Sequence, residues 1–114
     1  MHGQALVITK SHQNSDIFNQ DDKEFHYFLS AAKEVATLLR KKLGVKRVAM
    51  VAEGMGINHA HIKLYPLHGL REPFQEMWAK DRIYFDKYEG YLTTQLGPQA
   101  AMADLKELAK RIRE

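Results

Sequence analysis

The chain has 114 residues and a formal net charge of +3 at pH 7, with 45% hydrophobic and 27% charged residues. This is the size and composition of one soluble domain, so a single domain over residues 1–114 is expected. No apolar run reaches bilayer length, residues 1–10 lack a signal-peptide pattern, and a chain without cysteine has neither disulfides nor thiolate metal sites. We therefore expect a cytoplasmic protein with no membrane partner. Because its cations are interleaved with acidic residues, no specific nucleic-acid partner is expected either.

The first half of the chain predicts a strand, a long helix and two more strands. Residues 4–9 are apolar and β-branched toward their end, as in a buried strand. Over residues 22–43 apolar side chains recur every three or four positions, which predicts an amphipathic helix that Gly44 can end. Residues 46–52 and 58–66 have the composition of strands. Their short connection predicts that they are antiparallel neighbours.

The second half of the chain has weaker patterns. Pro73 can begin a short helix over residues 74–79, and residues 83–85 and 91–94 predict an extended or hairpin-like pair. Residues 101–112 have the apolar spacing of a final amphipathic helix with a basic last turn. The expected fold class is therefore α+β, with an antiparallel sheet, one long helix packed on it and a C-terminal helix.

The most informative segment is the strand expected over residues 58–66, where polar and apolar side chains alternate. Neighbouring side chains of an extended chain point to opposite faces of the sheet. His59, His61, Lys63 and Tyr65 are therefore expected on one face, with the apolar residues between them directed into the core. Two imidazoles and an ammonium group on one face are well suited to meeting a phosphate.

His61 is the candidate nucleophile of this face because it lies between His59 and Lys63. A neutral imidazole has a nitrogen lone pair that can attack phosphorus. The Lys63 ammonium attracts an anionic phosphate and offsets the negative charge that builds on the phosphoryl oxygens during displacement.

Three other interpretations of the same residues are left open. Imidazoles at i and i+2 can hold zinc, copper or iron, but a protonated lysine in the third position is no ligand, so no metal is expected. Both imidazoles can instead be ordinary polar residues on an exposed sheet face. Finally, the face can bind a nucleotide or phosphate without turning it over.

The chain resembles the histidine triad superfamily of nucleotide hydrolases and transferases. The motif of that family is His-φ-His-φ-His-φ-φ on a strand, where φ is apolar, with a glycine five residues before the first histidine. Gly54, His59 and His61 match that glycine and the first two histidines. Upstream, residues 3–12 resemble the family's Gly-His-x-Leu-Val-Ile-Pro-Lys-x-His, so the resemblance covers about residues 3–66.

The resemblance implies a reaction in which His61 attacks the α-phosphate of a nucleoside phosphoramidate or dinucleoside polyphosphate. A nucleotidyl-histidine intermediate forms, and water or another acceptor then resolves it, without metal or cofactor. It further implies that His59 supports His61 and that His12 lies beside the phosphate. Gly54 and Gly56 bring backbone N–H groups close to the anion. The protein is thus expected to be a hydrolase or nucleotidyl transferase with a small nucleotide as its partner.

The chain departs from the family pattern in three places. Lys63 replaces the third histidine, and a protonated lysine cannot accept a hydrogen bond as imidazole can. The family's Gly-Gln-x-Val reads Gly54-Met55-Gly56-Ile57. The N-terminal segment that precedes this region in the family is not in the chain, either through truncation or because a partner completes a minimal version. Since a sheet without its edge strands invites association, a homodimer is expected.

Overall fold

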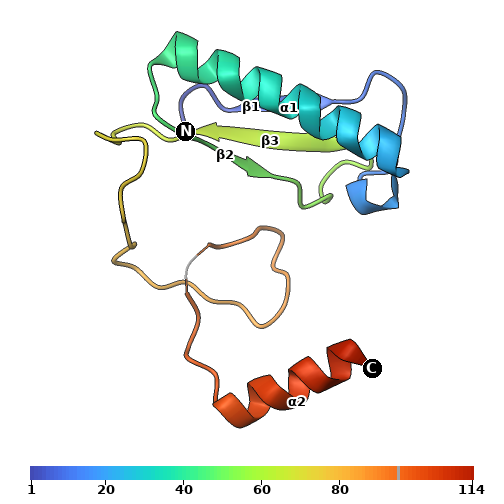
Figure 1. The fold of residues 1–114 in the computed structure, drawn as a ribbon, viewed down its shortest axis with the longest axis vertical. Helices are drawn as coiled ribbons and strands as arrows, with labels where there is room; N and C mark the ends of the chain where they lie inside the picture. Colours follow the sequence, from blue (N-terminus) through green and yellow to red (C-terminus); the bar gives the residue numbers. More distant parts are fainter. Residues whose placement is uncertain (95) are drawn as a thin grey trace. The chain divides into compact units, whose positions relative to one another are not determined.

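A three-stranded antiparallel sheet, two α-helices and a short 3-10 helix, η1 (Ile17–Asn19), make up the regular structure of the computed structural model, which describes residues 1–94 and 96–114 (Figure 1). The α+β class expected from the sequence is therefore confirmed. The chain divides into two compact units, residues 1–77 and residues 78–114. The single domain expected over residues 1–114 stays a prediction, and each unit is described by itself below.

The sheet of the first unit consists of β1 (Ala5–Ile8), β2 (Val48–Val51) and β3 (His61–Pro66) in the order β1-β3-β2. Both neighbours of β3 are antiparallel to it. The short connection between β2 and β3 thus joins adjacent antiparallel strands, as predicted. In this register Ile8 lies opposite His61, and Val51 lies opposite Lys63.

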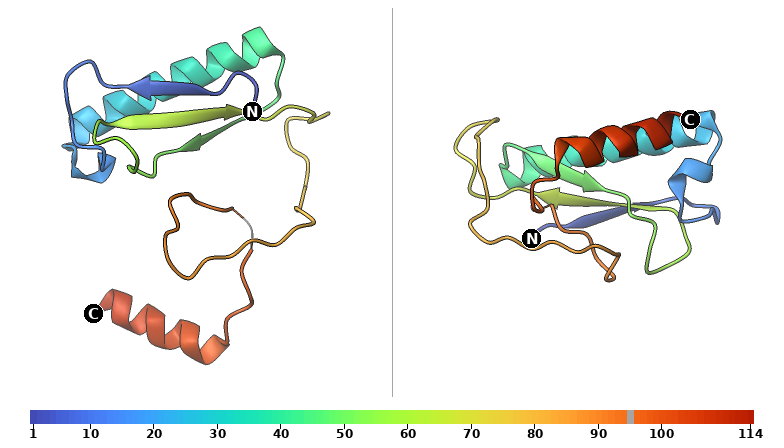
Figure 2. Two further views of the ribbon diagram at one scale, coloured as in Figure 1. Left: turned by 180° about the vertical axis from the view of Figure 1, so that it is seen from behind. Right: turned by 90° about the horizontal axis from the view of Figure 1, so that it is seen from below.

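The helix α1 (Asp22–Leu43) covers one face of this sheet (Figures 1 and 2). It begins where the Asp21 carboxylate accepts a hydrogen bond from the Glu24 N–H at 2.8 Å, and it ends at Gly44, whose φ of 66° is left-handed. The helix expected over residues 22–43 is confirmed. The buried core between helix and sheet contains Val7, Ile17, Phe28, Ala32, Ala60, Ile62 and Leu64.

The strand that carries the histidines is shorter than expected. It begins at His61 rather than Asn58, because the preceding N–H groups bond within loops instead of along the sheet. The Ala60 N–H donates to the Gln13 carbonyl, and the His59 N–H donates to the Ile57 carbonyl, each at 2.9 Å. His59 therefore lies in the loop before β3.

Helix α2 (Met102–Arg113) is the only helix or strand among the described residues of the second unit, and it confirms the predicted C-terminal helix. The short helix predicted over residues 74–79 is wrong. Residues 74–79 are not helical, because exposed Phe74 and Met77 have no core to pack against and a short helix needs such packing.

Residues 83–85 and 91–94 do not pair as strands. They are joined instead by the Thr93 hydroxyl, which donates to the Ile83 carbonyl at 3.2 Å, and by the rings of Phe85 and Tyr91 at 5.3 Å. In the part of the chain that the structure describes, no helix has the length and apolarity that spanning a bilayer requires.

Candidate functional site

The face of the sheet that α1 leaves open carries a cleft of about 510 Å³. Three of its lining residues are His59, His61 and Lys63, three of the four residues that the sequence places on one face; the fourth, Tyr65, does not line the cleft. Ala60, Ile62 and Leu64 point the other way and are at most 1% exposed. The predicted separation of a polar face from a core face is therefore confirmed, although His59 reaches the cleft from a loop. The remaining lining is Leu6, Ile8, Met55, Gly56 and Ile57.

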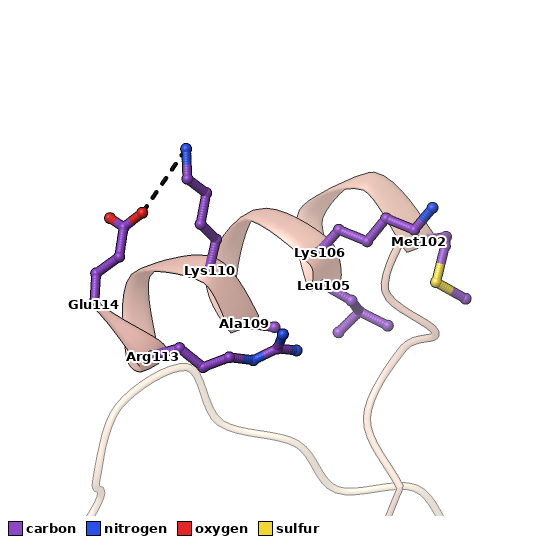
Figure 3. Close-up of a pocket in the computed structure, with 7 residues that line it drawn as sticks. All are labelled: Met102, Leu105, Lys106, Ala109, Lys110, Arg113 and Glu114. Atoms are coloured by element: carbon purple, nitrogen blue, oxygen red, sulfur yellow. Dashed lines mark ion pairs between the residues drawn. The ribbon is translucent and has the colours of Figure 1, made fainter.

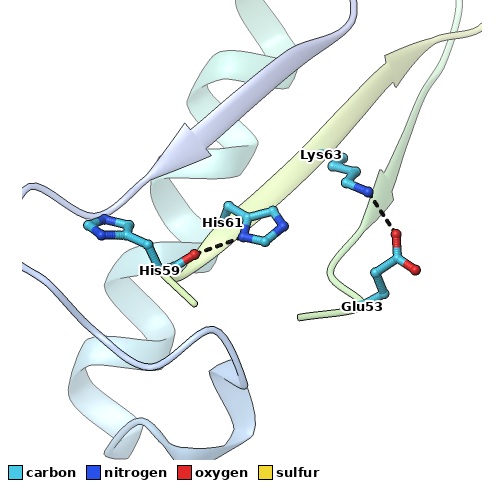
Figure 4. Close-up of polar contacts among 4 residues, drawn as sticks. All are labelled: Glu53, His59, His61 and Lys63. Atoms are coloured by element: carbon cyan, nitrogen blue, oxygen red, sulfur yellow. Dashed lines mark hydrogen bonds and ion pairs between the residues drawn. The ribbon is translucent and has the colours of Figure 1, made fainter. Parts of the chain in front are cut away.

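His61 has a defined orientation and tautomer. Its Nδ1 lies 2.7 Å from the carbonyl oxygen of His59, and a carbonyl only accepts, so Nδ1 carries the proton and donates it (Figure 4). In the neutral ring the lone pair is then on Nε2, which Figure 4 shows turned away from that carbonyl. The side chain is largely buried, with 9% of the residue exposed. The hydrogen bond of Nδ1 thus fixes the orientation of the ring and, in its neutral form, leaves Nε2 as the nitrogen with the lone pair.

His59 has a different environment. Its Nε2 lies 2.7 Å from the Thr9 carbonyl, to which it donates, and 3.2 Å from the Thr9 hydroxyl, which itself donates to the Ser11 carbonyl. The His12 ring packs edge-on against the His59 ring at 5.4 Å between centroids. His59 therefore supplies the carbonyl that orients His61 and ties its own ring to the loop after β1.

Lys63 forms an ion pair with Glu53. Its Nζ lies 2.7 Å from Oε1 of Glu53, and both side chains are partly buried (Figure 4). Sequence reasoning missed Glu53. Its position in the sequence could have indicated the contact, because Val51 lies opposite Lys63 and Glu53 follows two residues later. The side chains of Glu53 and Lys63 therefore lie on the same face of the sheet. Predicting this contact requires the strand register, which the sequence does not provide.

The loop after β1 and the loop before β3 are bonded to each other at several points. Ser15 donates from its N–H to Oδ1 of Asn58 at 3.0 Å and from its hydroxyl to the Gly54 carbonyl at 2.7 Å. Gly54 has a φ of 73°, and a Cβ there would lie 2.9 Å from the Ser15 carbonyl oxygen. Gly54 therefore allows the backbone before β3 to lie close to the backbone at Ser15. It does not line the cleft.

The other residues predicted for the site are placed as follows. Gly56 lines the cleft with a φ of 89° and open space around its Cα, whereas His12 contacts His59 without lining the cleft. The anion-binding roles predicted for His12, Gly54 and Gly56 stay predictions. Within residues 1–94 and 96–114 no three His, Asp or Glu side chains cluster as metal ligands would.

A second hollow lies along one side of α2, a helix without buried residues (Figure 3). Its polar groups include the ion pair between Lys110 and Glu114 at 3.9 Å, both of which are solvent-exposed. Such a pair contributes little and positions no reactive group. The cleft at His61 is the better candidate site.

Comparison with known proteins adds no relative: neither a family model nor a curated protein or solved structure matches this chain.

Proposed function

We propose that the chain is a histidine-triad-like nucleotide hydrolase or nucleotidyl transferase that acts through a nucleotidyl-histidine intermediate on His61. The observation that carries the proposal is the hydrogen bond from Nδ1 of His61 to the His59 carbonyl at 2.7 Å. It fixes the tautomer that leaves Nε2 free to attack, and it holds the ring in one orientation at the cleft.

In the proposed first step the Nε2 lone pair of His61 forms a bond to the α-phosphorus, and the P–O or P–N bond to the leaving group breaks. The leaving group takes the electron pair and a proton from the Lys63 ammonium. In the second step water attacks phosphorus, the N–P bond breaks, its electron pair returns to Nε2, and a water proton returns to Lys63. Two easier displacements replace one difficult displacement.

The apolar walls of the cleft suit the base of a nucleotide. Leu6, Ile8, Met55 and Ile57 are between 54% and 74% exposed, which is unusual for side chains of this kind unless something covers them. A base stacked on these side chains places its α-phosphate near His61 and Lys63, so a small nucleotide is the proposed partner.

A non-catalytic role as a nucleotide- or phosphate-binding protein is the second candidate. It is favoured by the Glu53–Lys63 ion pair, because a carboxylate at 2.7 Å competes with phosphate for the ammonium group and holds its proton. Binding then remains, while protonation of the leaving group is slow.

Incubation with adenosine phosphoramidate or diadenosine polyphosphate separates the two candidates. The catalytic proposal predicts AMP release that His61→Ala abolishes and that His26→Ala, an exposed histidine on α1, leaves unchanged. Release that survives His61→Ala overturns the catalytic assignment. Binding of the nucleotide without release supports the second candidate.

We further propose a homodimer in which β1 is the contact edge. The order β1-β3-β2 leaves β1 with an unpaired outer edge, and its Leu6 and Ile8 side chains are exposed on the cleft face. A second copy at that edge extends the sheet and adds a wall to the cleft. A cytoplasmic location stays a prediction.

A further inference from the structure

Four cations gather around a hollow of about 300 Å³ at the carboxyl-terminal half of α1, away from the His61 cleft. Lys33 and Arg40 lie two turns apart on one side of the helix, with Ala36 and Thr37 between them. Lys46, Arg47 and Val48 line the opposite side from the segment that leads into β2, and Pro73 completes the lining. The fold therefore concentrates charges that are dispersed along the sequence.

None of these four cations is paired with a carboxylate among the residues that the structure describes. In the described part of the chain no ion pair involves Lys33, Arg40, Lys46 or Arg47, and no acidic residue lines the hollow. Complementing the helix dipole accounts for Arg40 in the last turn of α1. It does not account for Lys33 in the middle of the helix, or for Lys46 and Arg47 beyond its end.

The Arg47 guanidinium is held in place within this group. Its Nε donates to the Pro73 carbonyl at 3.0 Å, and its Cζ lies 5.6 Å from the centroid of the Phe74 ring. These contacts leave the other guanidinium N–H groups for a ligand and lower the entropy lost when one binds. A small side chain, Ala36, and the Thr37 hydroxyl leave room at the centre.

We infer that this hollow binds a free oligophosphate, meaning two or more linked phosphate groups, either inorganic or as the phosphate chain of a nucleotide. Four cations around one small, open hollow match the several negative charges of such a chain, and a hollow of about 300 Å³ has room for a short compact anion. A nucleic-acid strand needs an extended groove with several stacking rings, whereas this hollow is small and the ring described beside it, Phe74, contacts Arg47. A second copy of the chain does not suit the hollow, because a two-fold axis through it would bring the four cations of one copy against those of the other.

Calorimetric titration of the full chain with sodium tripolyphosphate at low salt tests the inference. The variant Arg40→Gln/Lys46→Gln is compared with Lys106→Gln/Arg111→Gln, which removes the same charge from exposed positions on α2. We expect the first variant to weaken binding by about tenfold or more, since each charge-assisted contact is worth roughly that factor. The control should change the affinity by less than about twofold, because Lys106 and Arg111 do not line the hollow.

Three further titrations make the result specific. His61→Ala should leave tripolyphosphate binding at the hollow unchanged, and Arg40→Gln/Lys46→Gln should leave AMP release unchanged, so this inference and the proposed function fail independently. ATP binding that Arg40→Gln/Lys46→Gln weakens identifies a nucleotide phosphate chain as one source of the ligand, and binding of tripolyphosphate alone identifies the inorganic form. The inference is overturned by equal losses in both charge variants, by no tripolyphosphate binding, or by binding of single-stranded RNA alone.

Discussion

At the scale of single residues, the chemistry of the cleft depends on which ring nitrogen is free and on where Lys63 places its charge. The His59 carbonyl determines which nitrogen of His61 carries the proton, and the Glu53 carboxylate holds the Lys63 ammonium group in place. The sequence alone identifies both histidines and Lys63, because alternation along a strand is a local property. It does not identify Glu53, since that contact depends on the register of two strands.

The Glu53→Gln variant tests the role of the ion pair. Loss of the carboxylate leaves the Lys63 ammonium to the phosphate, so we predict that the Kd for AMP falls by about three- to tenfold, which corresponds to roughly 0.7 to 1.4 kcal/mol. Lys63→Gln should raise the Kd by a similar factor or more. Titration of each variant with AMP provides the measurement, and weaker binding after Glu53→Gln contradicts the competition described here.

At the scale of elements, local patterns predict α1 and its terminal glycine, because the apolar period over residues 22–43 and Gly44 agree. They do not predict the start of β3, where hydrogen bonds to Gln13 and within the loop replace the sheet ladder. Residues 74–79 show the opposite error. Their composition allows a helix, but packing that a sequence pattern does not provide decides whether one forms.

The loop–loop contact at Gly54 gives an element-scale prediction. In Gly54→Ala a Cβ meets the Ser15 carbonyl oxygen at 2.9 Å in addition to the strain of a positive φ, so we expect about 2–4 kcal/mol of lost stability. Gly56→Ala is the matched control, with positive φ and open space, and should cost about 1–2 kcal/mol. Urea unfolding measures both. Equal losses would show that the approach to Ser15 is unimportant.

At the scale of the whole molecule, the fully buried side chains among the described residues all lie within residues 1–77, where the core cluster is, while every apolar side chain of α2 is at least partly exposed. The sequence does not reveal this, because amphipathic spacing looks the same whether or not a partner surface exists. It also does not reveal the cluster of Lys33, Arg40, Lys46 and Arg47, which only the packing of α1 beside β2 assembles.

The proposed dimer gives a prediction at this scale. A lysine at an edge strand opposes edge pairing, so Leu6→Lys on β1 should shift the protein to a monomer. Met50→Lys on β2 is the matched control, since Met50 is similarly exposed on the other edge strand, and it should leave the dimer intact. Sedimentation velocity over a range of concentrations distinguishes the outcomes. A monomeric wild type, or dissociation caused only by Met50→Lys, contradicts the proposed contact at β1.

The central claim is that Nε2 of His61 forms a bond to phosphorus, and mass spectrometry of the protein denatured in base during turnover of diadenosine polyphosphate tests it most directly. We predict an added adenylyl group on the peptide that contains His61, present in His26→Ala and absent in His61→Ala. An adenylyl group on any other residue, or AMP release with no adduct on His61 at any time during turnover, would contradict the account.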